Sequence, residues 1–572
     1  MIEAGEILKN SGLLTAEQLE ILRKEKTAPS DVVSKAVDLG FVKEELALKS
    51  LGEEVGLEYV DLTKAEIDLS LLQIVPQRLI YRQSLFPLRR ENGSIVVATS
   101  NPFDLYPLDE VASATGLSVL PVLAERDEIS KLVKANLGVG GETVEGLLAQ
   151  KEEEDGVELL DEIETDGSEL SEMAQEASVI RLVNEILLEA VESRASDVHV
   201  ESQGSGLVIR YRIDGMLHSQ AVPPEINYFQ AAIISRLKIM SRLNIAEKRL
   251  PQDGRMKLKV HGREIDVRVS VIPMIHGESI VMRILDKGSL ALDLRTLGMD
   301  EDIYQEYQKL IQLPHGIVLV TGPTGSGKTT TLYSSLMEIR DEATKIITTE
   351  DPVEYQLDGI NQIQVHTKIG LTFAASLRSI LRHDPDVVLV GEIRDMETGE
   401  SAVQASLTGH LVFSTLHTND ASGAFARLID MGVEPFLIAS TVEGVMAQRL
   451  VRRLCKHCKQ SHEMNQADLP DDFPWDEFQA TGEKLYHPVG CRECRNVGYA
   501  GRMGIYELLV TTDEVRQLAH DNASTWDIKQ AGIRGGMITL RQYGWRKVLT
   551  GETSVDEILR VTKGDHSGKT QT

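Results

Sequence analysis

Cysteine is scarce in this chain: it accounts for 4 of 572 residues. So few thiols exclude a disulfide scaffold for a protein of this size. Long apolar runs are also missing, because no stretch approaches the ~20 residues needed to span a bilayer. The N-terminal segment Met1–Gly5 is acidic and lacks the basic region of a signal peptide. We therefore expect a cytoplasmic protein that reaches any membrane only through a partner.

Basic residues are outnumbered as well. Lysine and arginine number 60 against 88 aspartates and glutamates, which gives a formal net charge of -28. Because binding to a phosphate backbone rests on clustered basic residues, this balance argues against nucleic acid as the main ligand. Many of the acids lie between Glu142 and Glu176, where Lys151 is the only base. This segment predicts an extended, solvated linker, and the alternative is a tail that becomes ordered on a partner.

What is present is a chain long enough for roughly three or four domains. Residues 1–140 begin with short amphipathic helices, one of which has Thr15 as its N-cap and Gln18 as the capping-box partner. The pattern then changes to α/β, with strands predicted over Ser94–Thr99 and Ser118–Val122. We expect a small helical and α/β domain here.

Two larger domains follow the linker, which is placed at residues 141–176. Residues 177–288 combine a helix over Val179–Ala190 with alternating segments such as Leu207–Ile213, a pattern typical of an α+β domain. In residues 289–572, strands alternate with helical stretches. This alternation predicts a parallel sheet flanked by helices.

A phosphate-binding loop is predicted in the last domain. The apolar run Gly316–Thr321 leads into a glycine-rich turn that fits G-x-x-x-x-G-K-[ST], and helical spacing follows over Thr329–Met337. The predicted nucleotide-binding residues are Gly322, Pro323, Thr324, Gly325, Ser326, Gly327, Lys328, Thr329 and Thr330. Glycines let several N–H groups point at an anion, and the helix N-terminus adds partial positive charge. The alternative is a chance glycine loop before a helix. The sequence thus predicts a nucleoside triphosphate site, with Lys328 on the β- and γ-phosphates and the Thr329 hydroxyl on Mg²⁺.

Two other strands end in acids. The run Asp386–Val390 is followed by Glu392, with glycine in the place that usually holds an aspartate. A second run ends in the adjacent carboxylates Glu350 and Asp351. Because sites in such folds lie outside the carboxyl ends of strands, these acids are candidates for organising water and metal. The alternative is that they are solvated turn residues.

A third strand, within Gly409–Asn419, ends in polar residues that include His417. A neutral imidazole at such a strand end could sense the γ-phosphate of a bound nucleotide. A structural histidine that only forms hydrogen bonds fits the sequence equally well. Both interpretations of His417 therefore stay open.

The four cysteines form two C-x-x-C pairs, Cys455 with Cys458 and Cys491 with Cys494. This spacing is typical of tetrahedral thiolate coordination, and a cytoplasmic chain has little use for disulfides. The sequence predicts a structural Zn²⁺ that holds a subdomain together at residues 452–498 and takes no part in catalysis. A redox-active pair is the alternative.

Together, these motifs resemble the ATPases of type II secretion and type IV pilus assembly, and the likeness covers nearly the whole chain. Gly322–Thr330 is similar to that family's Walker A motif, and Ile346–Glu354 is similar to its Asp box. Leu381–Asp395 resembles its atypical Walker B motif, glycine before glutamate included, and Thr408–Asn419 resembles its His box. The paired cysteines are found in secretion and pilus-extension members, whereas retraction-type relatives generally lack them.

The resemblance implies a fold and an activity. The fold is α/β, a RecA-like P-loop NTPase motor domain preceded by an α+β, PAS-like domain and by a small N-terminal docking domain. The activity is ATP hydrolysis by a homo-hexamer that powers assembly of a secretion pseudopilus or a type IV pilus at the cytoplasmic face of the inner membrane. The implied partners are inner-membrane platform and docking proteins. The alternatives are a nucleic-acid translocase or conjugation motor on the same core, and a scaffold that binds ATP without hydrolysing it.

Roles for single residues follow from the same resemblance. Glu392 would organise the metal-bound water, and Glu350 would polarise the attacking water or act as base, with these two roles open to exchange. His417 would report the γ-phosphate to the moving parts. The domain before the motor would close over the nucleotide and donate arginines, of which Arg255 and Arg268 are the best matched by position.

That domain is recognised by its similarity to the family at Ala195–Glu201, Arg210–Gly215 and Pro251–Arg255. Arg263 and Arg283 are weaker candidates for the donated arginines. The alternative for all of them is ordinary surface pairing with nearby acids. The acids in question are Asp253, Glu264 and Asp266.

In some relatives the N-terminal domain binds cyclic di-GMP through a motif that opens with Arg-Leu-Gly and closes each half with Gln. Here Glu3, Ala4 and Gly5 stand in the first place and Glu25 stands in a closing place. Because the arginine that would clamp the phosphate is missing, we do not expect cyclic di-GMP to bind.

Overall fold

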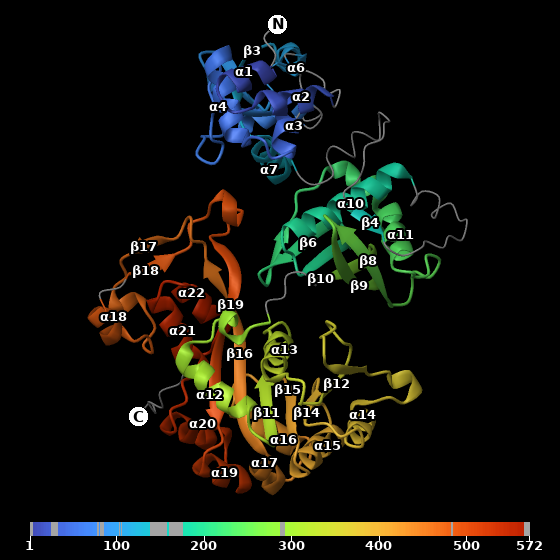
Figure 1. Cartoon of the computed structure of the whole chain (residues 1–572), viewed down its shortest axis with the longest axis vertical. Coiled ribbons are helices and arrows are strands. Elements are labelled where there is room, and N and C mark those ends of the chain that lie inside the picture. The colour runs from blue at the N-terminus through green and yellow to red at the C-terminus, as the bar shows by residue number, and fades with distance from the viewer. Residues whose placement is uncertain are drawn as a thin grey trace. The chain divides into compact units, whose positions relative to one another are not determined.

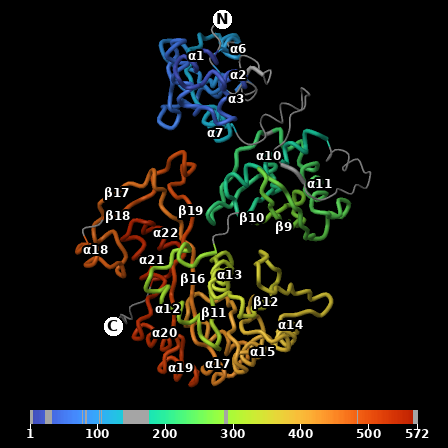
Figure 2. Tube along the Cα trace, viewed as in Figure 1, coloured from blue at the N-terminus to red at the C-terminus, as the bar shows by residue number. Residues whose placement is uncertain are grey.

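The structure is a computed structural model, and it describes residues 4–24, 32–76, 79–80, 85–101, 103–104, 106–137, 157–159, 176–286, 292–481 and 484–564. The chain divides into two compact units, Met1–Gly288 and Ser289–Thr572. Figure 1 labels their elements and Figure 2 traces the backbone. Among the described helices, none is both long enough and apolar enough to cross a bilayer.

Four helices open the first unit: α1 (Ala4–Asn10), α2 (Ala16–Lys24), α3 (Val32–Asp38) and α4 (Glu44–Val55). The predicted capping box at α2 is confirmed. Thr15 N–H donates to Gln18 Oε1 (2.9 Å), and Gln18 N–H donates to Thr15 Oγ1 (3.2 Å). The apolar side chains of all four helices meet in one small core, as their amphipathic spacing predicts.

A three-stranded sheet follows. β1 (Leu85–Glu91) pairs antiparallel with β2 (Ser94–Thr99), and β2 pairs in parallel with β3 (Ser118–Leu123). The remaining elements of this region are η1 (Leu69–Gln73), α6 (Tyr106–Thr115) and α7 (Arg126–Leu137). The two predicted strands are confirmed, and the second extends one residue beyond its predicted end.

The rest of the first unit is a seven-stranded sheet in the order β4-β8-β9-β10-β5-β6-β7, with every neighbouring pair antiparallel. Its strands are β4 (Val157–Leu159), β5 (Asp197–Gln203), β6 (Gly206–Ile213), β7 (Met216–Ser219), β8 (Gln252–Val260), β9 (Arg263–Met274) and β10 (Gly277–Asp286). Helices α10 (Ala177–Glu192) and α11 (Gln230–Met240), with η2 (Pro224–Phe229), contribute to one apolar core with the strands of this sheet. Figure 1 labels the two helices next to the sheet. Because strand side chains alternate between faces, the other face is left to polar residues.

One segment differs from its prediction. Val157–Leu159 lie within the predicted linker but form β4, which pairs with β8 through Val157 and Val260. An edge strand offers unpaired N–H and C=O groups, and an extended segment can add to them. The linker prediction is therefore wrong for these three residues. The rest of the predicted linker, except Glu176, lies outside the described residues.

The second unit contains a seven-stranded sheet in the order β13-β12-β14-β15-β11-β16-β19. Its strands are β11 (Gly316–Thr321), β12 (Ile346–Glu350), β13 (Asn361–Gln364), β14 (Val387–Val390), β15 (Leu411–Leu416), β16 (Val442–Leu454) and β19 (Tyr499–Val510). Six of them run parallel, and β19 runs antiparallel to β16. Every residue of β11, β14 and β15 is buried, as expected for parallel strands that helices cover on both faces.

Helices surround this sheet (Figure 1). They are η4 (Leu294–Leu297), α12 (Glu301–Ile311), α13 (Lys328–Ile339), η5 (Thr367–Ile369), α14 (Phe373–Ile380), α15 (Met396–Leu407), α16 (Gly423–Asp430), α17 (Pro435–Thr441), α19 (Asp513–His520), α20 (Thr525–Arg534), α21 (Leu540–Leu549) and α22 (Val555–Val561). The predicted parallel sheet flanked by helices is confirmed, and the unit has the α/β, RecA-like fold of a P-loop NTPase.

An insertion between β16 and β19 carries the cysteines. It comprises β17 (Gln460–His462), η6 (Gln466–Asp468), α18 (Trp475–Thr481), β18 (Leu485–His487) and η7 (Arg492–Cys494). The side chain of Asp472 attaches the insertion to α21 by accepting from Arg541 Nε (2.7 Å). The insertion is thus fixed to the body of the second unit.

Candidate active site

The predicted phosphate loop lies between β11 and α13. Gly327, the residue before α13, has φ 89°, a left-handed conformation that favours glycine. A Cβ at Gly327 would lie 2.8 Å from Gln448 Nε2, and one at Gly322 would lie 2.6 Å from Gln448 O. Both glycines are therefore needed for the close packing of the loop on β16. Because α13 begins at Lys328, its unpaired N–H groups face the loop, which is an arrangement that binds phosphate.

The Lys328 side chain turns back into this loop. Its Nζ donates to Gly322 O (2.7 Å) and Pro323 O (3.2 Å). Burial lowers the pKa of this ammonium to about 8, while Glu392 opposes the shift and Arg449 adds to it. A negative phosphate would favour the charged form of such a lysine. The position suits a lysine that binds a phosphate.

Glu392 and His417 come together at the ends of neighbouring strands. His417 Nε2 lies 3.3 Å from Glu392 Oε2, and Glu392 also forms an ion pair with Arg394. Glu392 acts on Lys328 through its charge. Lys328, Glu392 and His417 thus come together at the carboxyl ends of β11, β14 and β15.

Glu350 ends β12, the strand beside β14. Gly391 N–H donates to Thr349 O (2.8 Å), so the chain segments that carry Glu350 and Glu392 run side by side. The Glu350 side chain is only 4% exposed and accepts hydrogen bonds from Tyr333, Thr348 and Gln362. The two predicted acids therefore differ, since Glu392 forms an ion pair with Arg394 whereas the hydrogen-bond partners of Glu350 are neutral.

Two residues that were not predicted from the sequence support the phosphate loop, Gln448 and Arg449 on β16. Gln448 Oε1 accepts from Thr331 Oγ1 (2.8 Å), in the first turn of α13. Arg449 donates to Gln448 O (2.9 Å) and to Asn419 O (2.8 Å), and so connects β16 to the His box. No local signal marks them, because Gln448 is separated from Thr331 by 117 positions and is brought to it only by strand order.

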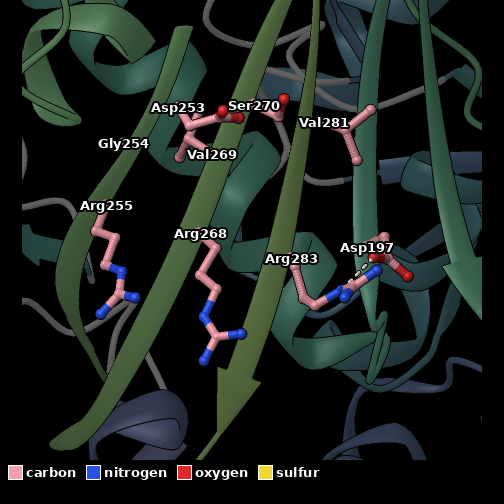
Figure 3. A pocket seen from close by; sticks show the side chains of 9 residues that line it. All are labelled: Asp197, Asp253, Gly254, Arg255, Arg268, Val269, Ser270, Val281 and Arg283. Carbon is pink, nitrogen blue, oxygen red and sulfur yellow. Dashed lines mark hydrogen bonds and ion pairs between the residues drawn. The ribbon is translucent and has the colours of Figure 1, made fainter. Parts of the chain in front are cut away.

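In the first unit, a cavity of about 360 Å³ opens on the polar face of the second sheet. Arg255, Arg268 and Arg283 are cross-strand neighbours on β8, β9 and β10, and their side chains extend side by side (Figure 3). Arg283 Nε donates to Asp197 Oδ1 (3.1 Å). The complete lining is Asp197, Asp253, Gly254, Arg255, Arg268, Val269, Ser270, Val281 and Arg283. Three guanidinium groups facing one cavity form a place for an anion.

The predicted arginines are therefore found in one row, joined by Arg283, which the sequence had ranked lower. Arg263 differs from them, because it pairs with Asp286 (2.9 Å) and does not line the cavity. Within the described residues, Arg255 forms no ion pair, so the alternative of surface pairing with Asp253 gains no support there.

The four cysteine sulfurs lie within 4.8 Å of one another. The Sγ–Sγ distances are 3.8 Å for Cys455 and Cys491, 3.7 Å for Cys458 and Cys494, and 3.8 Å for Cys491 and Cys494. A tetrahedral ion with metal–sulfur bonds of about 2.3 Å would separate its sulfurs by about 3.8 Å. Backbone N–H groups also point at the sulfurs, as from Gly498 to Cys494 Sγ (3.1 Å). The cluster has the dimensions of a four-thiolate metal site.

At the N-terminus, Glu3 and Glu25 lie outside the described residues. Gly5 is described, and it lies where α1 approaches α2: a Cβ there would be 2.4 Å from Leu19 Cδ1. Gly5 thus packs against an apolar side chain of α2.

Comparison with known proteins agrees with the motifs. Residues 172–560 match the family described as Type II/IV secretion system protein, which is more than half of the chain. Residues 55–142 match the MshEN domain. The larger match includes both the arginine cavity and the phosphate loop.

Curated relatives match along nearly their whole length. The type IV pilus assembly ATPase PilB of Myxococcus xanthus (strain DK1622) is 40% identical over 565 residues, which cover 98% of this chain and 99% of that protein. Type II secretion system protein E of Xanthomonas campestris pv. campestris is 43% identical over 561 residues, with 97% and 96% covered. Among solved structures, the pilus retraction motor PilT with bound ADP is 26% identical with a TM-score of 0.46, and covers 67% of this chain and 97% of that one. The chain therefore belongs to the Type II/IV secretion system protein family, a family of secretion and pilus-assembly ATPases.

Proposed function

We propose that this chain is the ATP-hydrolysing motor that powers assembly of a type II secretion pseudopilus or a type IV pilus from the cytoplasmic face of the inner membrane. ATPase activity follows from its family, and full-length relatives are named for both kinds of machine. The observation that carries the proposal is the meeting of Lys328, Glu392 and His417 at one edge of a parallel sheet.

The phosphate loop binds the nucleotide. Backbone N–H groups of the loop and of the first turn of α13 bind the phosphate oxygens, and Lys328 contacts the β- and γ-phosphates. The Thr329 hydroxyl, at the start of α13, is the ligand that the loop offers to Mg²⁺. When bound, Mg²⁺ would supply positive charge next to the phosphates.

Two acids and a histidine act on the γ-phosphate. Glu392 orders the water around the metal position, and Glu350 polarises the attacking water or accepts its proton. Exchange of these two roles is compatible with the same geometry. His417, which lies 3.3 Å from Glu392, senses the γ-phosphate and passes its presence to the His-box segment.

Arginines stabilise the charge that develops on the phosphoryl oxygens. Arg255 and Arg268 do so when their domain closes over a nucleotide, and Arg283 belongs to the same row. Planar, permanently charged guanidinium groups suit a transition state with charge spread over three oxygens. Hydrolysis then drives a rigid-body movement of one domain against the other.

The cysteine cluster holds one Zn²⁺, for which its sulfur spacing is suitable. Cys455, Cys458, Cys491 and Cys494 fill all four positions of a tetrahedral ion, so none is left for a substrate. The metal therefore has a structural role in the insertion, away from the phosphate loop.

As implied by the resemblance, the motor works as a homo-hexamer attached to inner-membrane platform and docking proteins. Residues 1–140, which hold most of the MshEN match at residues 55–142, are the part that docks. Cyclic di-GMP is not expected as its ligand, because Glu3 stands where the arginine of the binding motif would be.

The test is phosphate release by the purified full chain with MgATP, compared with Glu392→Gln. We expect the variant to bind ATP but to lose about 100-fold or more in kcat, because the group that orders the metal-bound water is gone. Glu306→Gln, on the exposed face of α12, is the matched control and should leave the rate unchanged. Equal phosphate release by wild type and Glu392→Gln would refute the motor and favour the ATP-binding scaffold.

A further inference from the structure

The carboxylate of Glu350 is enclosed by hydrogen-bond donors on both oxygens. Glu350 Oε2 accepts from the Tyr333 hydroxyl, and Oε1 accepts from Thr348 Oγ1 (2.6 Å) and Gln362 Nε2 (3.1 Å). Tyr333 is 1% exposed, Thr348 is fully buried and Glu350 is 4% exposed. Tyr333, Thr348 and Gln362 together form the Glu350 holding set. In the described part of the chain, no lysine or arginine contacts this carboxylate.

The holding set joins three elements of the motor. Tyr333 lies on α13, the helix that starts with Lys328, while Thr348 lies on β12 and Gln362 on β13. Since Glu350 ends β12, its carboxylate is fixed by its own strand, by the neighbouring edge strand and by the phosphate-binding helix. A carboxylate bonded from three directions has few rotamers left.

Two members of the holding set, Gln362 and Tyr333, also form hydrogen bonds with the loop that follows Glu350. Gln362 Oε1 accepts from Leu357 N–H (2.8 Å), and Gln362 Nε2 donates to Tyr355 O (3.0 Å). The Tyr333 hydroxyl oxygen accepts hydrogen bonds from the backbone N–H groups of Glu354 and Tyr355. The position of the carboxylate and the position of the loop 352–357 are therefore set by the same two side chains.

We propose that Tyr333, Thr348 and Gln362 are positioning residues for Glu350, and that Tyr333 and Gln362 make its orientation depend on the loop 352–357. This inference rests on the proposed function, in which Glu350 acts on the attacking water. A base is effective only within hydrogen-bond reach of the proton that it accepts, and small displacements reduce the rate strongly. The holding set supplies that placement, and none of its members is among the predicted nucleotide-binding residues.

The variants Tyr333→Phe, Thr348→Val and Gln362→Leu each remove one donor with little change of shape. We expect each to lower kcat about tenfold, because a hydrogen bond to a charged group is lost, while KM for ATP stays within about twofold. Thr348→Ser, which restores the hydroxyl, should restore kcat. If these residues only stabilised the fold, their loss would not lower kcat while leaving KM unchanged. The hydroxyl kept in Thr348→Ser would then make no difference to kcat.

Tyr307→Phe is the matched control for Tyr333→Phe. Tyr307 is also fully buried, but its hydroxyl bonds to Ser335 Oγ (2.9 Å) and not to an acid. Binding of a fluorescent ATP analogue and the unfolding midpoint show whether each variant is folded. The inference is overturned if the holding-set variants behave like Tyr307→Phe, if their kcat rises, or if KM changes together with kcat.

Glu350→Gln separates this inference from the proposed function. If Glu350→Gln keeps its full kcat, the assigned role of Glu350 is wrong, whatever the holding set does. If Glu350→Gln loses about 100-fold while the three holding-set variants match the control, the role of Glu350 stands and only the positioning inference fails.

Discussion

Arg263 and Arg268 lie on the same strand, yet their guanidinium groups have different surroundings. They are five positions apart, and alternation along a strand places an odd separation on opposite faces of the sheet. Arg263 pairs with Asp286 (2.9 Å), whereas Arg268 lines the cavity with Arg255 and Arg283. Parity along the strand therefore decides which arginines face the cavity.

This difference can be measured. Arg255→Ala and Arg268→Ala should each lower kcat for ATP hydrolysis by about 100-fold or more, because a donated arginine acts mainly on transition-state charge. Arg263→Ala is the matched control from the same strand and should keep kcat within about twofold. Comparable losses in all three variants would indicate damage to the sheet and not loss of a donated charge.

At the scale of elements, the cysteine insertion is attached to the rest of the second unit at only a few described places. Its two knuckles lie next to β16 and β19, and the Asp472–Arg541 ion pair attaches it to α21. The segment between the knuckles forms only short strands and helices. A bound metal would supply the constraint that a small core cannot.

We predict one Zn²⁺ per chain in protein purified without chelator, measured by plasma emission spectrometry. Cys491→Ser should lose the metal and lower the melting temperature, because removal of one thiolate opens a four-sulfur site. ATP binding at the phosphate loop should be retained in this variant. Metal-free wild-type protein with normal stability would contradict the assignment, and a reversible disulfide would favour the redox alternative.

Helix α22 is attached to β16 by a buried carboxylate. Glu557 has no exposed side-chain area, and its Oε2 accepts from Arg452 Nη2 (2.7 Å) while its Oε1 accepts from Arg560 Nη2 (2.6 Å). Burial alone would raise the pKa of this carboxyl, but the hydrogen bonds from Arg560 and Arg452 outweigh it and lower the pKa to about 2. The folded state therefore favours the ionised form.

A lowered folded-state pKa stabilises the protein above the ordinary glutamate value of 4.5, and this contribution is lost as the pH falls from there towards 2. Glu557→Gln should lower the stability of the second unit by up to about 3 kcal/mol at pH 7, and the difference from wild type should shrink below pH 4.5. Urea unfolding midpoints at pH 7 and at acid pH measure it. Glu514→Gln, from an exposed ion pair, is the control and should show little effect at either pH.

For the whole molecule, charge separates the proposed motor from its nearest alternative. A net charge of -28 disfavours binding of a phosphate backbone, although the arginine row forms a local positive site. A translocase needs a continuous basic path, whereas a site for one nucleotide needs only a few arginines. The acidic net charge and the single arginine row favour the site for one nucleotide.

We therefore expect single- or double-stranded DNA to leave the ATPase rate of the full chain within about twofold, at low and at moderate salt. The measurement is steady-state phosphate release with and without DNA. A strong stimulation that disappears as salt is added would contradict the secretion or pilus role and support the translocase alternative.

Local patterns in the sequence determined the elements and the chemistry that they carry. The phosphate loop was predictable because its strand, turn and helix are contiguous in the chain. The left-handed backbone at Gly327, with φ 89°, favours glycine at that single position, so the sequence itself marks it. The clustering of the four cysteines was predictable for the same reason, because the C-x-x-C spacing within each pair is typical of a metal knuckle. The capping box at Thr15 and Gln18 is also a contact within one turn.

The tertiary structure alone decided which distant residues complete each site. Gln448 supports the phosphate loop because β16 lies next to β11, and Arg283 joins Arg255 and Arg268 through the register of three strands. Tyr333 and Gln362 reach Glu350 from two elements that the chain pattern does not relate. Strand order and register arise from packing of the whole sheet. The sequence of a single strand does not specify which strands lie beside it.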